Sequence, residues 1–462
     1  MKPRRPTLVR LRLISLLRGS LVMLSALVGW AVSQSVPLQE GGGPLPADLA
    51  FTAPDGRLAL LPAGETSVEL LGIPGAVHAF PAFSPDGTQI AAIARSATSA
   101  QLVVFDLASE ARTTPAVWWD MPRRNVIYFD WRDDGKSILT LVSDPATGFT
   151  MRQVTPEGHD VLARGAPLFW DQTTQGGLLV HAGPPGPSRL LLLDAQGEEI
   201  FEVENPGPFR SPAASPTGDW LAYAEWEGAT RRLVVLRTPD QPGEANPTPS
   251  LSGTNDRRAL GYSGLTAFAW HPTRDVLALT RPTSEAPHTF GPLGGLDAET
   301  GLFEAWTDET VIAFWWSTQG ERIAVLASNG SGGGQVADAG LDTVLAGGAE
   351  FGLPVPSGAG VEAQPQQVQG SLSMRLGWLN PDGGDVTWLG NVQPGRTFFD
   401  QYVPFFDQYA RSHLAWAPDD AFFALEVIDE QGRSVIGIFD AEEGTVRHLA
   451  PGAMPSWSPV LR

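Results

Sequence analysis

The sequence predicts an all-β protein, a β-propeller of four-stranded antiparallel blades, and three observations support that prediction. A phrase consisting of an aromatic residue, a turn rich in Pro, Asp and Gly, and an apolar strand recurs along the chain. Most copies lie about 40 to 50 residues apart, which is the length of one propeller blade. The chain also stops one strand into a repeat, as expected if its last strand closes a ring.

Each copy of the phrase indicates a β-hairpin followed by two further strands. The first complete copy begins with Phe83-Ser84-Pro85-Asp86-Gly87 and continues into the apolar run Ile90-Ala91-Ala92-Ile93. Pro and Asp favour a tight turn, and Gly accepts the positive φ angle that such turns need. A third strand is expected at Gln101 to Asp106, and a fourth after the next turn. One repeat therefore predicts one four-stranded sheet, which buries its faces against neighbouring repeats.

Successive copies are headed by residues that we call blade anchors. They are Phe83, Trp131, Trp170, Ala214, Trp270, Trp316, Trp416 and Trp457. The last copy is truncated, whereas the segment from Phe51 to Leu71 supplies strands without an anchor of its own. We therefore expect the C-terminal strand to join the N-terminal blade and close an eight-bladed ring over residues 50–462. Seven blades are the alternative, because the copy at Trp170 is degenerate.

Residues 1–33 have the pattern of a signal peptide. Basic residues precede an apolar run from Leu21 to Val32, whose end offers small residues for cleavage. A membrane anchor is the alternative, because Leu13 to Val32 is nearly long enough to span a bilayer. A cleaved signal predicts a periplasmic or extracellular protein, and an uncleaved one predicts a membrane-anchored protein that faces outside. Residues 34–49 are assigned as a linker.

The composition excludes several classes of function. The chain has no cysteine, which excludes disulfides, lipid-modified cysteine and thiolate metal sites. Its net charge of −20 opposes binding to nucleic acid phosphates and to anionic lipid. The sequence contains no nucleophile elbow, no phosphate-binding loop and no His-Glu-x-x-His motif. We therefore expect no catalytic residues, no cofactor, no metal and no nucleic acid partner.

The repeat has a counterpart in a known family. Phe83-Ser84-Pro85-Asp86-Gly87 with Ile90-Ala91 resembles the repeat of TolB-type periplasmic propellers, which are related to WD-repeat proteins. The resemblance covers about residues 50–462. It implies the propeller fold, a place in the cell envelope and binding to other proteins. The pattern departs from TolB in two ways: the separate domain that precedes TolB's propeller has no counterpart here, and we count more blades.

Two insertions interrupt the repeat, and both are expected on the same face of the ring. Residues 328–370 are rich in Gly, Ala and Pro, which indicates a flexible lid or a disordered loop. The aromatic loop 395–412 contains Phe398-Phe399-Asp400-Gln401-Tyr402 and a tandem copy, Phe405-Phe406-Asp407-Gln408-Tyr409. These side chains either pack beneath the loop or form a recognition surface. The candidate binding residues are Phe398, Asp400, Tyr402, Phe405, Asp407, Tyr409, Arg411 and His413.

The sequence thus predicts an exported, non-enzymatic, TolB-like propeller. We expect it to be a scaffold or binding protein for an envelope protein or a small ligand, which docks on the insert-bearing face. One alternative is a propeller hydrolase or lyase that uses acidic residues around the central channel. The other is a solute-sensing subunit associated with a membrane transporter.

Overall fold

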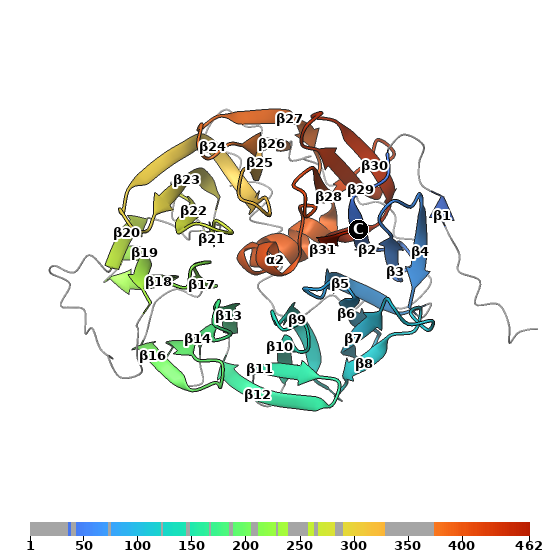
Figure 1. The fold of residues 1–462 in the computed structure, drawn as a ribbon, viewed down its shortest axis with the longest axis horizontal. Helices are drawn as coiled ribbons and strands as arrows, with labels where there is room; N and C mark the ends of the chain where they lie inside the picture. The colour runs from blue at the N-terminus through green and yellow to red at the C-terminus, as the bar shows by residue number, and fades with distance from the viewer. Residues whose placement is uncertain are drawn as a thin grey trace, which may run out of the picture.

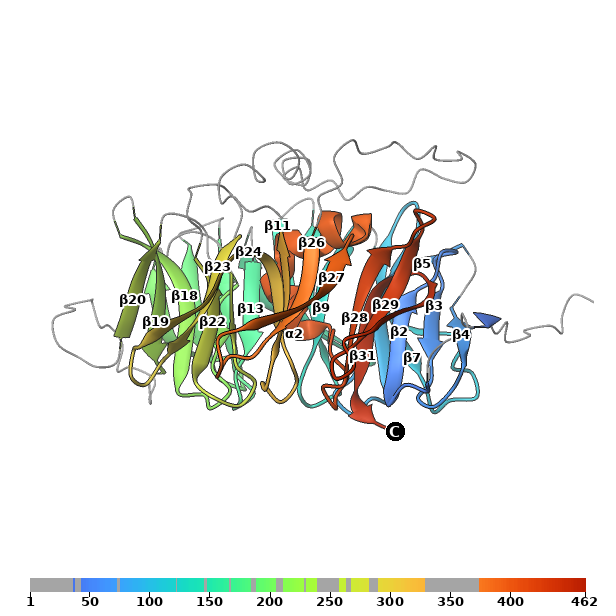
Figure 2. The same cartoon turned by 90° about the horizontal axis from the view of Figure 1, so that it is seen from above.

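The chain folds as a ring of small sheets. The computed structural model describes residues 36–37, 43–72, 75–121, 123–144, 148–165, 168–183, 188–204, 211–227, 230–238, 257–262, 267–281, 290–328 and 374–462. Within these residues the antiparallel sheets are arranged around a central axis (Figure 1). Seen from the side, the ring is a flat disc whose strands run through its thickness (Figure 2). The predicted all-β propeller is confirmed.

The first five blades each form a separate sheet. Blade 1 contains β31 (Ala453–Leu461), β2 (Ala47–Thr52), β3 (Leu58–Leu61), β4 (Ser67–Leu71) and β1 (Val36–Pro37). Blade 2 contains β5 (Val77–Phe83), β6 (Gln89–Arg95), β7 (Ala100–Asp106) and β8 (Ala116–Trp119). Blade 3 contains β9 (Asn125–Trp131), β10 (Ile138–Asp144), β11 (Gly148–Thr155) and β12 (Gly158–Gly165). Blade 4 contains β13 (Leu168–Gln172), β14 (Leu178–Ala182), β15 (Arg189–Leu193) and β16 (Glu199–Glu204). Blade 5 contains β17 (Ala213–Ala214), β18 (Trp220–Glu227), β19 (Thr230–Arg237) and β20 (Arg257–Tyr262).

The last three blades are less regular. Blade 6 contains β21 (Phe268–Trp270), β22 (Val276–Thr280), β23 (Gly291–Asp297) and the first part of β24 (Phe303–Trp316). Blade 7 contains the rest of β24, β25 (Ile323–Ser328), β26 (Met374–Leu379) and β27 (Val386–Val392). Blade 8 contains β28 (Phe422–Ile428), β29 (Ser434–Asp440) and β30 (Val446–Pro451). On its axial side, Trp416 forms an isolated bridge with Phe423.

One long strand joins blades 6 and 7. The first part of β24 pairs with β23, and its second part pairs with β25. The strand passes from the outer edge of one blade to the inner edge of the next without a break (Figure 1). The two blades therefore share one seven-stranded sheet.

The ring closes as the ends of the sequence predict. β31 is the innermost strand of blade 1 and pairs with β2, so that Leu49 lies opposite Trp457 and Thr52 lies opposite Ala453. β1 and the start of β2 fall within residues 34–49, so part of the segment assigned as a linker belongs to blade 1. The predicted signal peptide 1–33 and residues 329–370 of the first insertion lie outside the described residues.

The tryptophan anchors connect neighbouring blades. Four of them donate an indole N–H to a backbone carbonyl of the preceding blade's inner strand. These bonds run from Trp131 to Ala82 (3.0 Å), from Trp270 to Ala213 (3.2 Å), from Trp316 to Ala269 (3.1 Å) and from Trp416 to Trp315 (3.1 Å). The recurring aromatic position thus both fills the space between blades and fixes their spacing.

The aromatic insertion is helical. It forms a π-helical turn at Phe398–Tyr402, a 3₁₀ turn at Val403–Phe405 and the helix α2 at Phe406–Ser412. A spacing of seven residues is about two helical turns, and the tyrosines of the two copies, Tyr402 and Tyr409, stack on each other. Figure 1 shows α2 over the central axis of the ring. We call residues 395–413 the axial segment.

Candidate functional site

The axial segment is held at the centre of the ring by a stack of four aromatic rings. Phe398 stacks on Tyr402 at 5.4 Å between centroids, and Tyr402 stacks on Tyr409 at 5.3 Å. Tyr409 in turn stacks on Phe80 of β5 at 4.6 Å, with the two rings only 10° from parallel. The stack therefore runs from both copies of the motif into blade 2, and Tyr128 of β9 packs edge-on against it. Offset aromatic contacts of this kind add to the stabilisation that burial provides.

The ring contributes a strained residue to this stack. Phe80 has a φ angle of +55°, at a point where the register between β5 and β6 shifts. This conformation costs a bulky residue about 1 kcal/mol or more, so the surroundings must hold it in place. The backbone N–H of Phe80 donates to the sulfur of Met454, and its carbonyl accepts from Nε2 of His413 at 3.1 Å. The predicted site residue His413 thus fixes the strand that carries Phe80.

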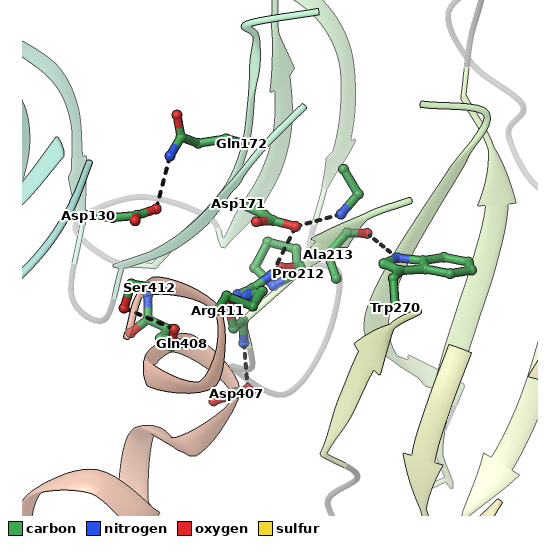
Figure 3. A network of polar contacts seen from close by, with 12 residues as sticks. Asp130, Asp171, Gln172, Pro212, Ala213, Trp270, Asp407, Gln408, Arg411 and Ser412 are labelled. Carbon is green, nitrogen blue, oxygen red and sulfur yellow. Dashed lines mark hydrogen bonds and ion pairs between the residues drawn. The ribbon is translucent and has the colours of Figure 1, made fainter. Parts of the chain in front are cut away.

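A polar network fixes the end of α2 to blades 4 and 5 (Figure 3). Arg411 forms an ion pair with Asp171 of β13 at 2.9 Å and donates to the carbonyl of Pro212 at 2.8 Å and to the hydroxyl of Ser211. The backbone N–H of Ser211 donates to Asp407 at 3.3 Å. Both charged side chains of α2 in this network are therefore engaged by the ring rather than by solvent.

A carboxyl group stands beside this network. Asp130 of β9 accepts a hydrogen bond from Nε2 of Gln172 at 3.0 Å. Burial raises the pKa of Asp130 to about 7, although the bond from Gln172 lowers it in part. The neighbouring negative charge of Asp171 raises it further. Asp130 thus titrates in the range in which a general acid or base works.

A second buried carboxyl group holds the start of the axial segment. Glu426 of β28 is 3% exposed and accepts from the hydroxyl of Ser434 at 2.7 Å. The backbone N–H of Gly395 donates to the carbonyl of Glu426, and a Cβ at Gly395 would overlap the Glu426 side chain. Burial raises the pKa of Glu426 to about 7, whereas hydrogen bonds from Ser434 and Thr397 lower it. Only glycine fits position 395 without moving this side chain.

Little space remains beneath the axial segment. A cavity of about 40 Å³ lies between Phe80, Trp315, Phe398, Met454 and Glu426. Ligand pockets usually measure about 300 to 1,000 Å³. The axial segment therefore fills this part of the ring's centre with side chains, and the cavity is too small for a substrate.

The two copies of the motif differ in burial. In the second copy Asp407 is 5% exposed and Tyr409 is 4% exposed, whereas in the first copy Asp400 is exposed and Tyr402 is half-buried. Asp400 pairs with Arg396, whose side chain is 91% exposed. The Asp and Tyr of the second copy thus face the ring, whereas Asp400 of the first copy faces solvent. At the first position the order is reversed, because Phe398 is buried and Phe405 is half-buried.

The structure brings all eight predicted site residues into one segment. Four of them, Phe398, Asp407, Tyr409 and His413, are buried. Three are half-buried, namely Tyr402, Phe405 and Arg411. The burial agrees with the packing interpretation for most of these side chains, and recognition through the remaining surface stays a prediction.

Several residues of the site lie outside the sequence prediction. Phe80 and Glu426 belong to strands whose local sequence pattern does not mark them, and the register shift at Phe80 is seen only in the structure. Asp171 and Gln172 follow the anchor Trp170, in the copy of the phrase that departs most from the repeat. That departure was a usable signal, because the polar pair ends β13 ahead of a turn at 173–176, two residues later than in the other copies, and meets Arg411 and Asp130.

Neither a metal site nor a membrane span is found in the part of the chain that the structure describes. No three His, Asp or Glu side chains there are grouped so that they could hold a metal ion. None of the helices in the described ranges is long and apolar enough to cross a bilayer.

Comparisons with known proteins show similarity at the level of the fold only. No protein-family model matches the chain, and no curated protein matches it. An oligogalacturonate lyase in complex with manganese is 10% identical with a TM-score of 0.44, over 91% of this chain and 86% of that one. The dihydro-heme d1 dehydrogenase NirN is 12% identical with a TM-score of 0.49, over 91% and 76%. A putative TolB from Agrobacterium tumefaciens is 12% identical with a TM-score of 0.32, over 58% and 91%. These are distant similarities to propeller proteins, and they indicate no specific family.

Proposed function

We propose that this protein is an exported, non-enzymatic binding protein or scaffold whose partner docks on the outer side of the axial segment. The observation that carries the proposal is the unequal burial of the two motif copies. The second copy anchors the segment through Tyr409 and Asp407, and the first copy leaves Asp400 in solvent. A duplicated motif whose Asp and Tyr are buried in one copy and partly displayed in the other suits a recognition element on a rigid frame.

The displayed surface has the chemistry of a protein contact. Phe399 and Phe405 are half-buried, and the charged pair of Arg396 and Asp400 lies between solvent and the aromatic rings. Aromatic and arginine side chains contribute most to the free energy of binding at protein interfaces. Because the four-ring stack already orders the segment, binding costs little conformational entropy. An envelope protein is therefore the partner class that we favour over a small ligand at this face.

The geometry offers less support for a hydrolase or lyase that uses channel carboxylates. Asp171 and Asp407 are engaged by Arg411 and by the backbone of Ser211. Asp130 and Glu426 have suitable pKa values, but the cavity that Glu426 lines is only about 40 Å³. Glu426 is 3% exposed beneath the axial segment, and the space beside it does not admit a substrate.

A charge reversal on the displayed copy tests the proposal. Asp400→Arg should reduce the amount of partner that is cross-linked to the exported protein in intact cells, because it removes the charge that the surface presents. Asp308→Arg is the matched control, since Asp308 is an exposed acid in β24, outside the axial segment. Equal cross-linking of the parent and both variants, with equal thermal midpoints, would contradict the proposal.

Export is tested separately. We propose that residues 1–33 direct the chain out of the cytoplasm, on the basis of the basic and apolar pattern alone. N-terminal sequencing of the mature protein should give a first residue near Gln34. An intact Met1 in a membrane fraction would support the anchor alternative, and an intact Met1 in the cytoplasm would contradict export.

A further inference from the structure

The turn that follows each blade anchor departs from the repeat at two places. The turn ends in a glycine with a positive φ angle in most described copies: Gly87, Gly135, Gly218 and Gly320 lie four residues after the anchor, and Gly176 lies six residues after Trp170. Arg274 takes this position in blade 6, and Asp420 takes it in blade 8. The two departures lie on either side of blade 7, and both fix hairpins that border a polar cleft on the surface.

Blade 6 builds its turn in a different way. In the other copies the N–H of the fourth residue donates to a backbone carbonyl, as Gly320 does to Ser317 at 2.9 Å. In blade 6, Nδ1 of His271 instead accepts from the N–H groups of Thr273 at 3.0 Å and Arg274 at 3.1 Å. The His271 ring then lies where a Cβ at Gly320 would stand, so that such a Cβ would overlap Nε2 of His271. Hence the hairpins of blades 6 and 7 are packed against each other by a side chain found in this copy alone.

Asp420 fixes the neighbouring hairpin of blade 7. Its carboxylate accepts from the backbone N–H groups of Thr318 at 2.6 Å and Gln319 at 3.0 Å, and from the hydroxyl of Thr318. Asp420 itself is 7% exposed and has a φ angle of +58°, which is unusual for a residue other than glycine. This hairpin is therefore held rigidly from blade 8.

A polar cleft of about 720 Å³ opens between these hairpins. It is lined by the blade 6 turn, by the blade 7 hairpin at Gln319–Arg322, and by the outer hairpin of blade 7 from Trp378 to Thr387. Arg274 spans the cleft to Asp382 at 3.5 Å. The cleft lies among hairpins that join strands 1 and 2 or strands 3 and 4, so it is on the opposite face of the ring from the axial segment. Its volume is typical of pockets that bind small molecules.

The walls of the cleft are fixed, whereas several of its polar side chains are not engaged. In the described part of the chain, the side chains of Gln319, Glu321, Asp385 and Thr387 form no hydrogen bond or ion pair with the protein. Arg322 uses one nitrogen to donate to the carbonyl of Ala441 at 3.2 Å. A rigid frame that carries free hydrogen-bonding groups is preorganised for a polar ligand.

We propose that this cleft binds a short, uncharged oligosaccharide. A sugar hydroxyl both donates and accepts, so it matches a lining that contains free carboxylates, an amide, a hydroxyl and guanidinium groups. The cleft holds two arginines and three acidic residues, so a ligand with charge of a single sign would meet a like charge within it. A neutral ligand with many hydroxyl groups meets no such penalty.

The test is binding of the purified protein to an array of neutral, amine-bearing and acidic glycans, with each hit measured by calorimetry. We expect a neutral oligosaccharide to bind, and the double variant Glu321→Gln with Asp385→Asn to bind it at least tenfold more weakly. The matched control is Glu65→Gln, because Glu65 is an exposed acid in blade 1, away from the cleft. Asp400→Arg should bind the sugar like the parent protein, which separates this inference from the proposed function.

Three results would overturn the inference. They are binding of charged glycans only, binding of no glycan at all, and binding by the double variant that equals that of the parent protein. Thermal unfolding of each variant identifies a loss of binding that comes from misfolding. For such a variant, Thr387→Ala supplies the same comparison without changing a charge.

Discussion

Replacement of Tyr409 by alanine removes the centre of the four-ring stack. The Tyr409 ring is 4% exposed and contacts Phe80, Tyr402, Tyr128 and His413 with centroid distances between 4.6 and 5.3 Å. Loss of a buried aromatic side chain usually costs roughly 3 to 5 kcal/mol. We expect a cost in this range for Tyr409→Ala, because no neighbouring side chain can fill the gap without leaving its own stack. Tyr409→Phe keeps the ring and should unfold like the parent protein.

The assay must distinguish release of the axial segment from unfolding of the ring. Hydrogen exchange followed by mass spectrometry reports on residues 398–412 separately from the blades, and denaturant unfolding reports on the whole protein. Tyr409→Ala should raise exchange in the axial segment and lower the unfolding midpoint, whereas Tyr409→Phe should do neither. If Tyr409→Ala left both measurements within error of the parent values, the stack would not be what holds the segment.

Three further predictions follow from the same contacts. The pKa of Glu426 is raised in the folded protein, so its stabilising effect is complete below its unfolded pKa and is lost as pH rises through about 7. In denaturant titrations, Glu426→Gln should therefore gain stability over the parent protein between pH 5 and pH 8, by on the order of 2 to 3 kcal/mol. A difference in stability that does not change with pH would contradict this prediction. Arg411→Ala should lower the free energy of unfolding by roughly 3 kcal/mol, because it leaves Asp171 and Asp407 without their cation. Arg411→Lys should recover only part of that loss. A loss below about 1 kcal/mol for Arg411→Ala is typical of ordinary surface changes and would contradict the prediction. Deletion of residues 455–462 should abolish cooperative unfolding and cause aggregation, because it removes most of β31 and exposes the edge of β2; a truncated protein that melts like the parent would refute the closure argument.

The repeat was sufficient to predict the ring because most blades begin with the same hairpin, which is specified by residues close together in the sequence. Each anchor precedes a turn and a second apolar strand, so the hairpin could be identified from neighbouring residues alone. The closure by β31 could be predicted as well, because a truncated last repeat and an unanchored first one complete each other. The continuous strand β24 could not be predicted, because the change of blade within it follows no turn signal.

The axial segment was recognisable as a departure from the repeat, but its partners were not. The tandem motif repeats after seven residues, which is about two helical turns, so the spacing itself is compatible with a helical segment. Phe80 and Glu426 meet the segment through contacts more than 25 residues away along the chain, and their own strands look ordinary. Sequence patterns report local order, whereas the burial that separates an anchoring copy from a displayed copy arises only in the assembled ring.

The most direct test of the account places a photoreactive amino acid at position 400 and, in a second protein, at position 65 on the other side of the ring. Both positions are exposed, and both are acidic in the parent protein. After illumination of cells that export each protein, we expect one discrete cross-linked species from position 400 that is absent from position 65. Identical cross-linking patterns from the two positions, or none from position 400, would contradict the claim that the axial segment presents a docking surface.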